Sequence, residues 1–132
     1  MRVLLVEDDF ICRKILLTYF YKQSECECDV ASNGSEAIEA FMLAKESGKP
    51  YDLIMLDIMM PEMSGQEVLK RIRAIEEAQG LTATAARIVM TTALKDSDSI
   101  MGAFRHQCDG YLVKPIAFDK LTKLISELKL VF

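Results

Sequence analysis

The sequence predicts an α/β fold built on a doubly wound, five-stranded parallel sheet. Short apolar runs recur along the chain, at residues 3–6, 28–31, 53–56, 88–90 and 111–113. Most of these runs do not alternate between apolar and polar residues, which is typical of strands covered on both faces. Amphipathic helical patterns separate the runs, so the chain reads as five successive strand–helix units.

The size of the chain favours one arrangement of these units. A length of 132 residues fits one domain spanning residues 1–132. The flavodoxin-like strand order 2-1-3-4-5 is common for a doubly wound sheet of this size, although periodicity alone does not fix the order. We expect five helices to cover the two faces of the sheet.

Each helix is predicted by apolar residues that recur at three- and four-residue spacing. The five stripes are Ile11, Ile15 and Tyr19; Ala37, Ile38, Phe41 and Met42; Val68, Leu69, Ile72 and Ile75; Ile100, Met101 and Phe104; and Leu121, Leu124, Ile125 and Leu128. Asn33 is placed to cap the second helix, and Ser64 with Glu67 predicts a capping box at the third. Residues 79–86 are expected to form a loop.

The composition excludes several classes of protein. Apolar residues make up 51% and charged residues 27% of the chain, which provides ample core material for a globular domain. The net charge of -4 argues against a nucleic-acid-binding surface. No apolar run approaches the ~20 residues of a membrane-spanning helix, and no signal-peptide pattern opens the chain. We therefore expect a cytoplasmic protein, in which the four cysteines are reduced thiols.

Charged residues follow three of the predicted strands. Glu7 and Asp8 follow the first strand, Asp57 the third and Lys114 the fifth. In an open parallel sheet the carboxyl ends of neighbouring strands converge on one crevice, so these side chains are expected to lie close together. Three crowded carboxylates repel one another, and a hard divalent cation such as Mg²⁺ would relieve the repulsion. The pattern predicts a site for Mg²⁺ and a phosphoryl group.

Each of these residues, taken alone, has a simpler interpretation. Thr92 at the end of the fourth strand fits ordinary β-sheet chemistry, and a lysine such as Lys114 is commonly a solvated charge. Asp9 trails the acidic pair and is predicted to start the first helix rather than to bind a metal. His106 is the only histidine, and we expect it at a surface or a helix end. The functional interpretation depends on the combination of residues.

That combination resembles the receiver domain of two-component response regulators, in particular the single-domain, chemotaxis-regulator-like form. The resemblance covers essentially the whole chain. It is carried by the pair Glu7-Asp8, Asp57 within L-D-I-M-M-P-E-M-S-G, Thr92-Ala93, and the segment G-Y-L-V-K-P that contains Lys114. Glu7 stands where the commoner residue of the family is aspartate, a variant that the family also uses.

The resemblance implies a role for each acidic residue. Asp57 would accept a phosphoryl group from a sensor histidine kinase or a histidine phosphotransfer protein. Asp8 would ligate Mg²⁺ directly, Glu7 through water and Met59 through its backbone carbonyl, together with Asp57. An aspartate has a reference pKa near ~4, so we expect Asp57 to be ionised at neutral pH and to need no general base.

The resemblance also implies how the signal leaves the site. Thr92 and Lys114 would bind the phosphoryl group, and Thr92 and Tyr111 would form a switch. The output partner would dock on the face of the fourth helix, fifth strand and fifth helix, and phosphorylation could also drive dimerisation. The protein would be a signalling switch that catalyses its own phosphorylation and dephosphorylation, with no direct contact to nucleic acid or membrane. The bond between Lys114 and Pro115 is expected to be cis, as in relatives.

Three alternatives remain open. An Asp-nucleophile phosphohydrolase commonly carries a second acid two residues after the nucleophile, but Met59 occupies that position. A flavin-binding module would need a hydroxyl- and glycine-rich phosphate loop where Glu7, Asp8 and Asp9 stand. Within the receiver interpretation, the chain is either a stand-alone protein or a domain of a longer regulator or hybrid histidine kinase.

Overall fold

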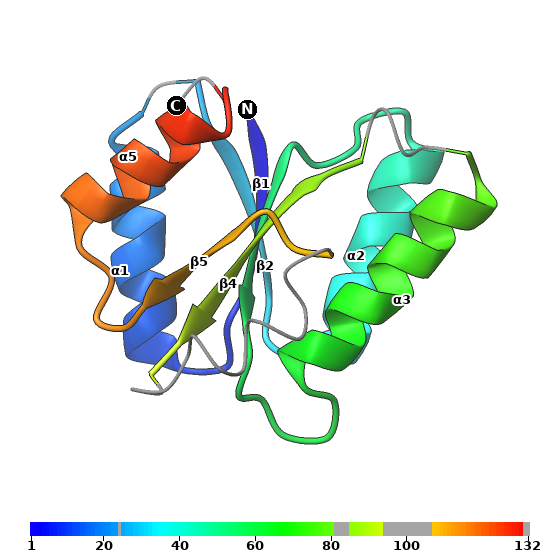
Figure 1. Ribbon diagram of the computed structural model, residues 1–132, viewed down its shortest axis with the longest axis horizontal. Helices are drawn as coiled ribbons and strands as arrows, with labels where there is room; N and C mark the ends of the chain where they lie inside the picture. Colours follow the sequence, from blue (N-terminus) through cyan, green and yellow to red (C-terminus); the bar gives the residue numbers. More distant parts are fainter. Residues whose placement is uncertain (24, 81–84, 94–106, 131–132) are drawn as a thin grey trace.

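The predicted sheet is confirmed, including its strand order. The computed structural model describes residues 1–23, 25–80, 85–93 and 107–130. All strand pairs are parallel and follow the order β2-β1-β3-β4-β5 (Figure 1). The strands are β1 (Arg2–Val6), β2 (Glu27–Ala31), β3 (Leu53–Asp57), β4 (Arg87–Thr92) and β5 (Gly110–Val113).

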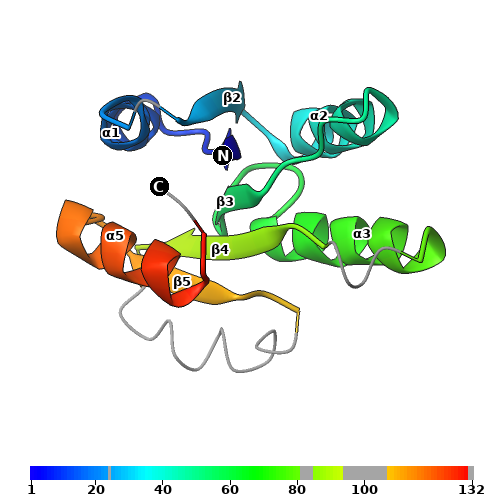
Figure 2. The same ribbon diagram turned by 90° about the horizontal axis from the view of Figure 1, so that it is seen from above.

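Helices cover both faces of this sheet, as expected of a doubly wound fold. They are α1 (Phe10–Tyr21), α2 (Gly34–Glu46), α3 (Gly65–Ala78) and α5 (Phe118–Glu127). Helices α1 and α5 lie on one face, and α2 and α3 lie side by side on the other (Figures 1 and 2). The helix expected around Ile100, Met101 and Phe104 lies outside the described residues, as does His106. None of the helices in the described ranges has the length and apolar character that crossing a bilayer requires.

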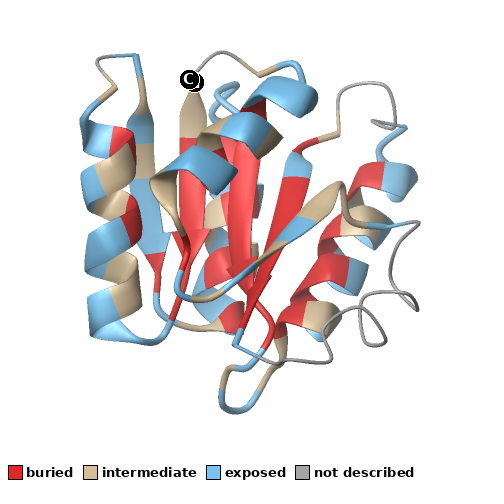
Figure 3. Cartoon of the chain, turned by 60° about the vertical axis from the view of Figure 1, so that its left-hand side comes forward, coloured by how far each residue is buried: buried red, intermediate tan, exposed pale blue. Residues whose placement is uncertain are grey.

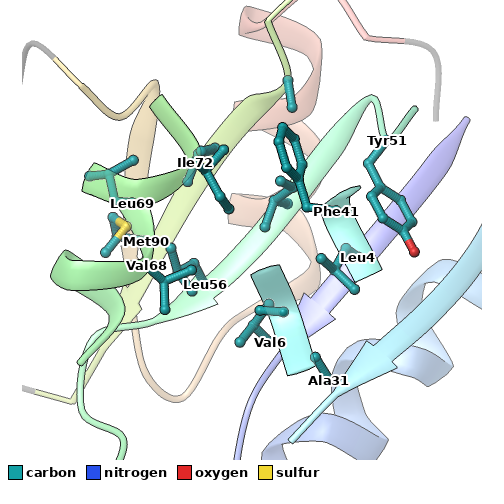
Figure 4. Packing of buried hydrophobic residues seen from close by; sticks show 14 of the residues in the cluster. Leu4, Val6, Ala31, Phe41, Tyr51, Leu56, Val68, Leu69, Ile72 and Met90 are labelled. Carbon is teal, nitrogen blue, oxygen red and sulfur yellow. The ribbon is translucent and has the colours of Figure 1, made fainter. Parts of the chain in front are cut away.

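The central strands are buried on both faces, which explains their unbroken apolar runs. Leu4 and Val6 of β1 point into a cluster shared with α2 and α3, whereas Val3 and Leu5 point into a cluster shared with α1 and α5. All residues of β3 are buried (Figure 3). Figure 4 shows the first cluster, which contains Phe41 among its members.

Helix α1 turns a different face to the core from the one predicted. Ile11 and Ile15 are 68% and 40% exposed, whereas Leu16 and Phe20 are buried. Only Tyr19 of the predicted stripe packs against the core cluster. Because α1 carries apolar residues around most of its circumference, its spacing could not identify the buried side.

The predicted helix starts are confirmed. The Asn33 side chain accepts a hydrogen bond from the Glu36 backbone N–H at 2.9 Å, and the Ser64 hydroxyl accepts one from the Glu67 N–H at 3.3 Å. The Glu67 carboxylate pairs with Arg71 one turn further along α3 instead of accepting from the Ser64 N–H, so only one half of the predicted capping box is formed. Such caps satisfy backbone donors that have no partner inside the helix. The four cysteines are unpaired, as expected.

A buried polar network ties α3 to the amino ends of β4 and β5. The Glu76 carboxylate is 2% exposed; it accepts from Arg73 at 2.6 Å and from the Ala86 N–H at 2.8 Å. Arg73 also pairs with Asp109 at 3.0 Å, and Asp109 accepts from the Ile88 N–H at 2.8 Å. The network thereby fixes the amino ends of β4 and β5. Thr92 lies at the carboxyl end of β4, and Lys114 follows the carboxyl end of β5.

Candidate functional site

The three predicted acids meet at the carboxyl ends of β1 and β3. The two strands pair directly, with Val6 opposite Leu56, so Glu7 and Asp57 emerge side by side. Glu7, Asp8 and Asp57 each offer a carboxylate oxygen, and these oxygens lie within 4.8 Å of one another. Glu7 is 1% and Asp57 3% exposed, whereas Asp8 is exposed. The structure thus brings together the carboxylates that the sequence singled out.

Lys114 projects into this acidic cluster from the end of β5. Its Nζ lies 2.5 Å from Glu7 Oε1 and 3.4 Å from Asp57 Oδ1. The Lys114 N–H donates to the Thr92 carbonyl at 2.7 Å, which anchors the lysine backbone to β4. The Lys114–Pro115 bond is cis, as the resemblance implied. One ammonium therefore pairs with two of the three carboxylates, and the cluster favours further positive charge.

The cluster changes the ionisation of its members. Burial raises the pKa of Asp57 to about 8, the Glu7 carboxylate acts in the same direction, and Lys114 opposes the shift. Burial lowers the pKa of Lys114, but the Glu7 and Asp57 carboxylates outweigh this effect and raise it overall. Asp57 therefore holds its proton more tightly than a free aspartate, and the ionised nucleophile that we expect at neutral pH depends on further positive charge in the cluster.

The loop from β1 to α1 is held by two residues with different tasks. Asp9 Oδ1 accepts from the Ile11 N–H at 2.9 Å and caps α1, and these backbone bonds lower its pKa. The prediction that Asp9 starts the helix is confirmed. Arg13 donates to the Glu7 carbonyl at 2.9 Å and reaches the Ser32 hydroxyl at 3.4 Å. This role of Arg13 was not predictable, because nothing in its spacing along the chain shows that it turns back toward the acidic loop.

The loop after β3 approaches α3 closely, and Gly65 makes this possible. The Gly65 N–H donates to the Ile58 carbonyl at 2.9 Å. A Cβ at residue 65 would overlap the carbonyl oxygen of Asp57, so a side chain there would displace the loop. The Met59 N–H donates to Asp57 Oδ1 at 3.2 Å, while the Met59 side chain is 61% exposed. Gly65 is a second residue whose close contact with the acceptor loop no sequence pattern indicates.

The two residues predicted to form a switch occupy neighbouring strands. Thr92 is fully buried at the end of β4, and Tyr111 is 36% exposed on β5. In the ladder between these strands, Thr92 lies opposite Val113, two residues from Tyr111. The remainder of the predicted output face involves residues 94–106, which lie outside the described ranges.

The donor set fits a hard divalent cation. The three side chains offer only oxygen atoms, as Mg²⁺ prefers, and two of them are buried. Burial first, and the neighbouring Glu7 carboxylate second, raise the pKa of Asp57, and a divalent cation in the cluster would favour its ionised form.

The doubly wound sheet and the acidic cluster at its switch point define a domain class, and comparison with known proteins identifies the family. Residues 3–126 match the family model described as response regulator receiver domain, so the chain belongs to this family. It is 34% identical over 129 residues to the regulatory protein VanRB of Enterococcus faecalis, covering 97% of this chain and 52% of that protein. It is 32% identical to the response regulator mcs4 of Schizosaccharomyces pombe, covering 96% of this chain and 27% of mcs4. The chain thus spans about half or less of these relatives.

Solved structures agree with this assignment. The receiver domain of Saccharomyces cerevisiae Ssk1, crystallised with the histidine phosphotransfer protein Ypd1, superposes with a TM-score of 0.80 at 31% identity, covering 96% of this chain and 87% of that one. The receiver domain of the histidine kinase CKI1 from Arabidopsis thaliana, complexed with Mg²⁺ and BeF3-, gives a TM-score of 0.81 at 28% identity, covering 97% and 89%. The domain is a signalling receiver.

Proposed function

We propose that Asp57 takes up a phosphoryl group from a phosphohistidine of a sensor histidine kinase or a histidine phosphotransfer protein. The observation that carries this proposal is the cluster of Glu7, Asp8 and Asp57, with oxygens within 4.8 Å of one another, faced by Lys114. The likeness to Ssk1, which was solved with a phosphotransfer protein, supports the nature of the donor.

The chemistry follows from the placement of these groups. An Asp57 carboxylate oxygen attacks the phosphorus, the new O–P bond forms as the N–P bond of the phosphohistidine breaks, and the bonding electron pair returns to the imidazole nitrogen. Phosphoryl transfer depends mainly on alignment and charge neutralisation. Lys114 and the Thr92 hydroxyl would contact the oxygens of the phosphoryl group. Asp57, Thr92 and Lys114 would thus form the catalytic set with which the domain promotes its own phosphorylation and dephosphorylation.

Mg²⁺ is the cation that we assign to the acidic cluster. Asp8 and Asp57 would bind it directly, Glu7 through water, and Met59 through its backbone carbonyl. When bound, it supplies positive charge to the phosphoryl oxygens and favours the ionised form of Asp57. The oxygen-only donor set supports this assignment, as does the relative CKI1, which was solved with Mg²⁺ and BeF3-.

The phosphoryl group would act as a switch because it adds negative charge and acceptor oxygens at one buried point. Thr92 would move toward it, and Tyr111 would turn inward from its exposed position on β5. A protein partner, or a second phosphorylated copy, would then bind the surface of β5, α5 and the segment between β4 and β5. This route requires that the two states differ in affinity for the partner.

We also propose that residues 1–132 form one receiver domain that works in the cytoplasm. It would act either alone or within a longer regulator or hybrid histidine kinase. The exposed, apolar Met59 side chain offers no acid for turnover of outside substrates, which disfavours the phosphohydrolase alternative.

Phosphorylation by a small donor tests the proposal. The protein is incubated with acetyl phosphate, with and without Mg²⁺, and analysed by intact and peptide mass spectrometry. We expect one base-labile phosphoryl group on Asp57 that forms only with Mg²⁺. Asp57→Asn should abolish it, whereas Asp119→Asn, an exposed carboxylate change on α5, should leave it intact. Comparable uptake by Asp57→Asn would refute the assignment of the acceptor.

A further inference from the structure

Helix α2 exposes large apolar side chains in addition to those that it buries against the sheet. Its buried side chains Ala37, Phe41 and Ala44 face the sheet. Met42 and Leu43 lie outside this buried set and are 44% and 57% exposed. Large apolar residues exposed side by side on a helix mark a surface that favours contact with another molecule.

These residues line a groove rather than a flat surface. Ile38, Met42 and Leu43 of α2 form its apolar wall, Met63 from the segment before α3 adds to it, and Arg71 of α3 closes the far side. The groove is shallow and open to solvent, with a volume of about 410 Å³. We call this feature the α2/α3 groove. It lies on the side of the sheet away from α1 and α5 (Figures 1 and 2).

The geometry of the α2/α3 groove selects a helix as its occupant. Its residues on α2 run from Ser35 to Glu46, which corresponds to ~16 Å of helix, or about three turns, at the usual rise per residue. Most of the lining comes from α2, whose backbone groups are already paired internally. An extended peptide would find no strand edge here to satisfy its own N–H and C=O groups, whereas a helix brings its own pairing.

The charges around the α2/α3 groove favour a helix with basic side chains. Glu39 and Glu46 line it, while the Arg71 guanidinium already pairs with Glu67 at 3.2 Å. The lining is therefore acidic on balance, and lysine or arginine on the occupant would complement it. A second copy of this chain, with a net charge of -4, fits this requirement less well.

We propose that the α2/α3 groove binds an amphipathic helix of a partner protein, with leucine, isoleucine or methionine on its buried face and lysine or arginine along its flanks. The groove is separate from the acidic cluster and from the predicted output surface on β5 and α5. The domain would thus hold a partner on this side whether or not Asp57 is phosphorylated, which goes beyond the proposed switch.

A designed peptide tests this proposal with the full chain. The probe is a cross-linked helical peptide of about four turns with leucine at spacings of three and four and lysine on its flanks, since short uncrosslinked helices are marginal in water. Binding is followed by NMR chemical-shift changes and by fluorescence anisotropy of a labelled peptide. We expect shifts at Ile38, Met42, Leu43 and Met63, with an affinity that weakens as salt is raised.

Variants and control peptides separate the apolar contribution to binding from the charge contribution. Leu43→Glu should weaken binding roughly tenfold or more, as expected for the loss of a buried leucine. Tyr21→Glu makes the same kind of change at a side chain 64% exposed on α1 and should have no effect. Glu46→Lys should weaken the lysine-flanked peptide and strengthen a glutamate-flanked one.

Several outcomes would overturn the proposal. Equal affinity for lysine- and glutamate-flanked peptides would refute the charge argument, and shifts confined to other surfaces would refute the groove. Concentration-dependent shifts of Met42 and Leu43 without peptide would show that a second copy is the occupant. Failure of Asp57 phosphorylation would leave these binding results unaffected, so the two proposals fail independently.

Discussion

The Lys114 ammonium lies closer to Glu7 than to Asp57, at 2.5 Å from Glu7 Oε1 and 3.4 Å from Asp57 Oδ1. The lysine therefore compensates mainly the residue beside the acceptor while no phosphoryl group is present. A phosphoryl group on Asp57 would bring new anionic oxygens into competition with Glu7 for the same ammonium. The ion pair with Glu7 makes Lys114 a structural counter-ion as well as a candidate catalytic group.

Removal of this counter-ion should destabilise the metal-free protein. Lys114→Met leaves the Glu7 carboxylate buried without its cation, and breaking a buried ion pair in this way costs about 3 kcal/mol. Urea unfolding in chelator measures the loss, and Lys120→Met, an exposed lysine on α5, is the control. Saturating Mg²⁺ should reduce the deficit because the dication replaces the lost charge. A loss no larger than that of Lys120→Met would contradict the pairing.

Neutralising Asp57 should stabilise the protein, in contrast to Lys114→Met, and the gain in the free energy of unfolding should depend on pH. The folded pKa of Asp57, about 8, exceeds the unfolded value near ~4, so the folded protein binds the proton more tightly. Stability is therefore lost as the pH rises from ~4 through about 8. Asp57→Asn does not titrate, so it should exceed wild type in chelator by at least about 1–2 kcal/mol near pH 8 and by little near pH 4.

Urea unfolding at both pH values, with and without Mg²⁺, checks this prediction. Mg²⁺ should stabilise wild type by mass action and narrow the difference from Asp57→Asn. Superimposable unfolding curves for the two proteins in chelator at the higher pH would show that Asp57 is not crowded.

The close approach of α3 to the acceptor makes Gly65 sensitive to substitution. Gly65→Ala places a methyl group against the Asp57 backbone, so the loop or the helix must move. Gly48→Ala is a matched control with open space around it, where only the positive φ of 75° opposes a side chain, at about 1 kcal/mol. In denaturant unfolding, we expect Gly65→Ala to lose more free energy of unfolding than Gly48→Ala. Only Gly65→Ala should lower the affinity for Mg²⁺. Equal losses would show that the backbone at Gly65 adapts without cost.

The strands and helices in the described part of the chain were predictable from local hydrophobic patterns, and the acidic cluster was predictable from the residues that follow the strands. Glu7, Asp57 and Lys114 follow buried strands, and parallel pairing alone brings such positions together. The buried face of α1 was not predictable, because both sides of that helix are apolar. The network of Arg73, Glu76 and Asp109 was also missed, since its partners are up to 36 residues apart and meet only through tertiary packing.

The exposed start of α1 should contribute to recognition of the phosphohistidine partner. Ile11 is 68% exposed in the first turn of α1, and the next residue, Cys12, lines a pocket of about 110 Å³ together with Lys114 of the acidic cluster. Ile11→Asp should slow transfer from the cognate histidine protein while leaving phosphorylation by acetyl phosphate unchanged. Ile116 borders the same pocket but is only 9% exposed, so its substitution would disturb the core as well. Equal slowing with both donors would indicate damage to the fold.

The lifetime of the phosphorylated state should depend on the residue two positions after the acceptor. Hydrolysis of the aspartyl phosphate needs a water aligned opposite the Asp57 oxygen, and misalignment is costly in phosphoryl transfer. The Met59 side chain is apolar and 61% exposed, so it cannot orient that water by hydrogen bonding. Leu94, which we expect to flank the phosphoryl group after Thr92, lies outside the described residues. We therefore expect a long-lived phosphorylated state that needs a phosphatase, or return of the phosphoryl group to a histidine protein, for rapid reset.

Replacing Met59 with asparagine should shorten this lifetime, because an amide can hold the attacking water. A gain of ~1.4 kcal/mol in transition-state stabilisation corresponds to roughly tenfold faster decay. The measurement is loss of phosphorylated protein with time in Mg²⁺ buffer without partners, and Met42→Asn, at an exposed methionine on α2, is the control. Since Met59 holds its place near the acceptor through its backbone N–H, the substitution should leave the Asp57 contact intact. Decay of wild type within seconds, or equal rates for Met59→Asn and wild type, would rule out this role.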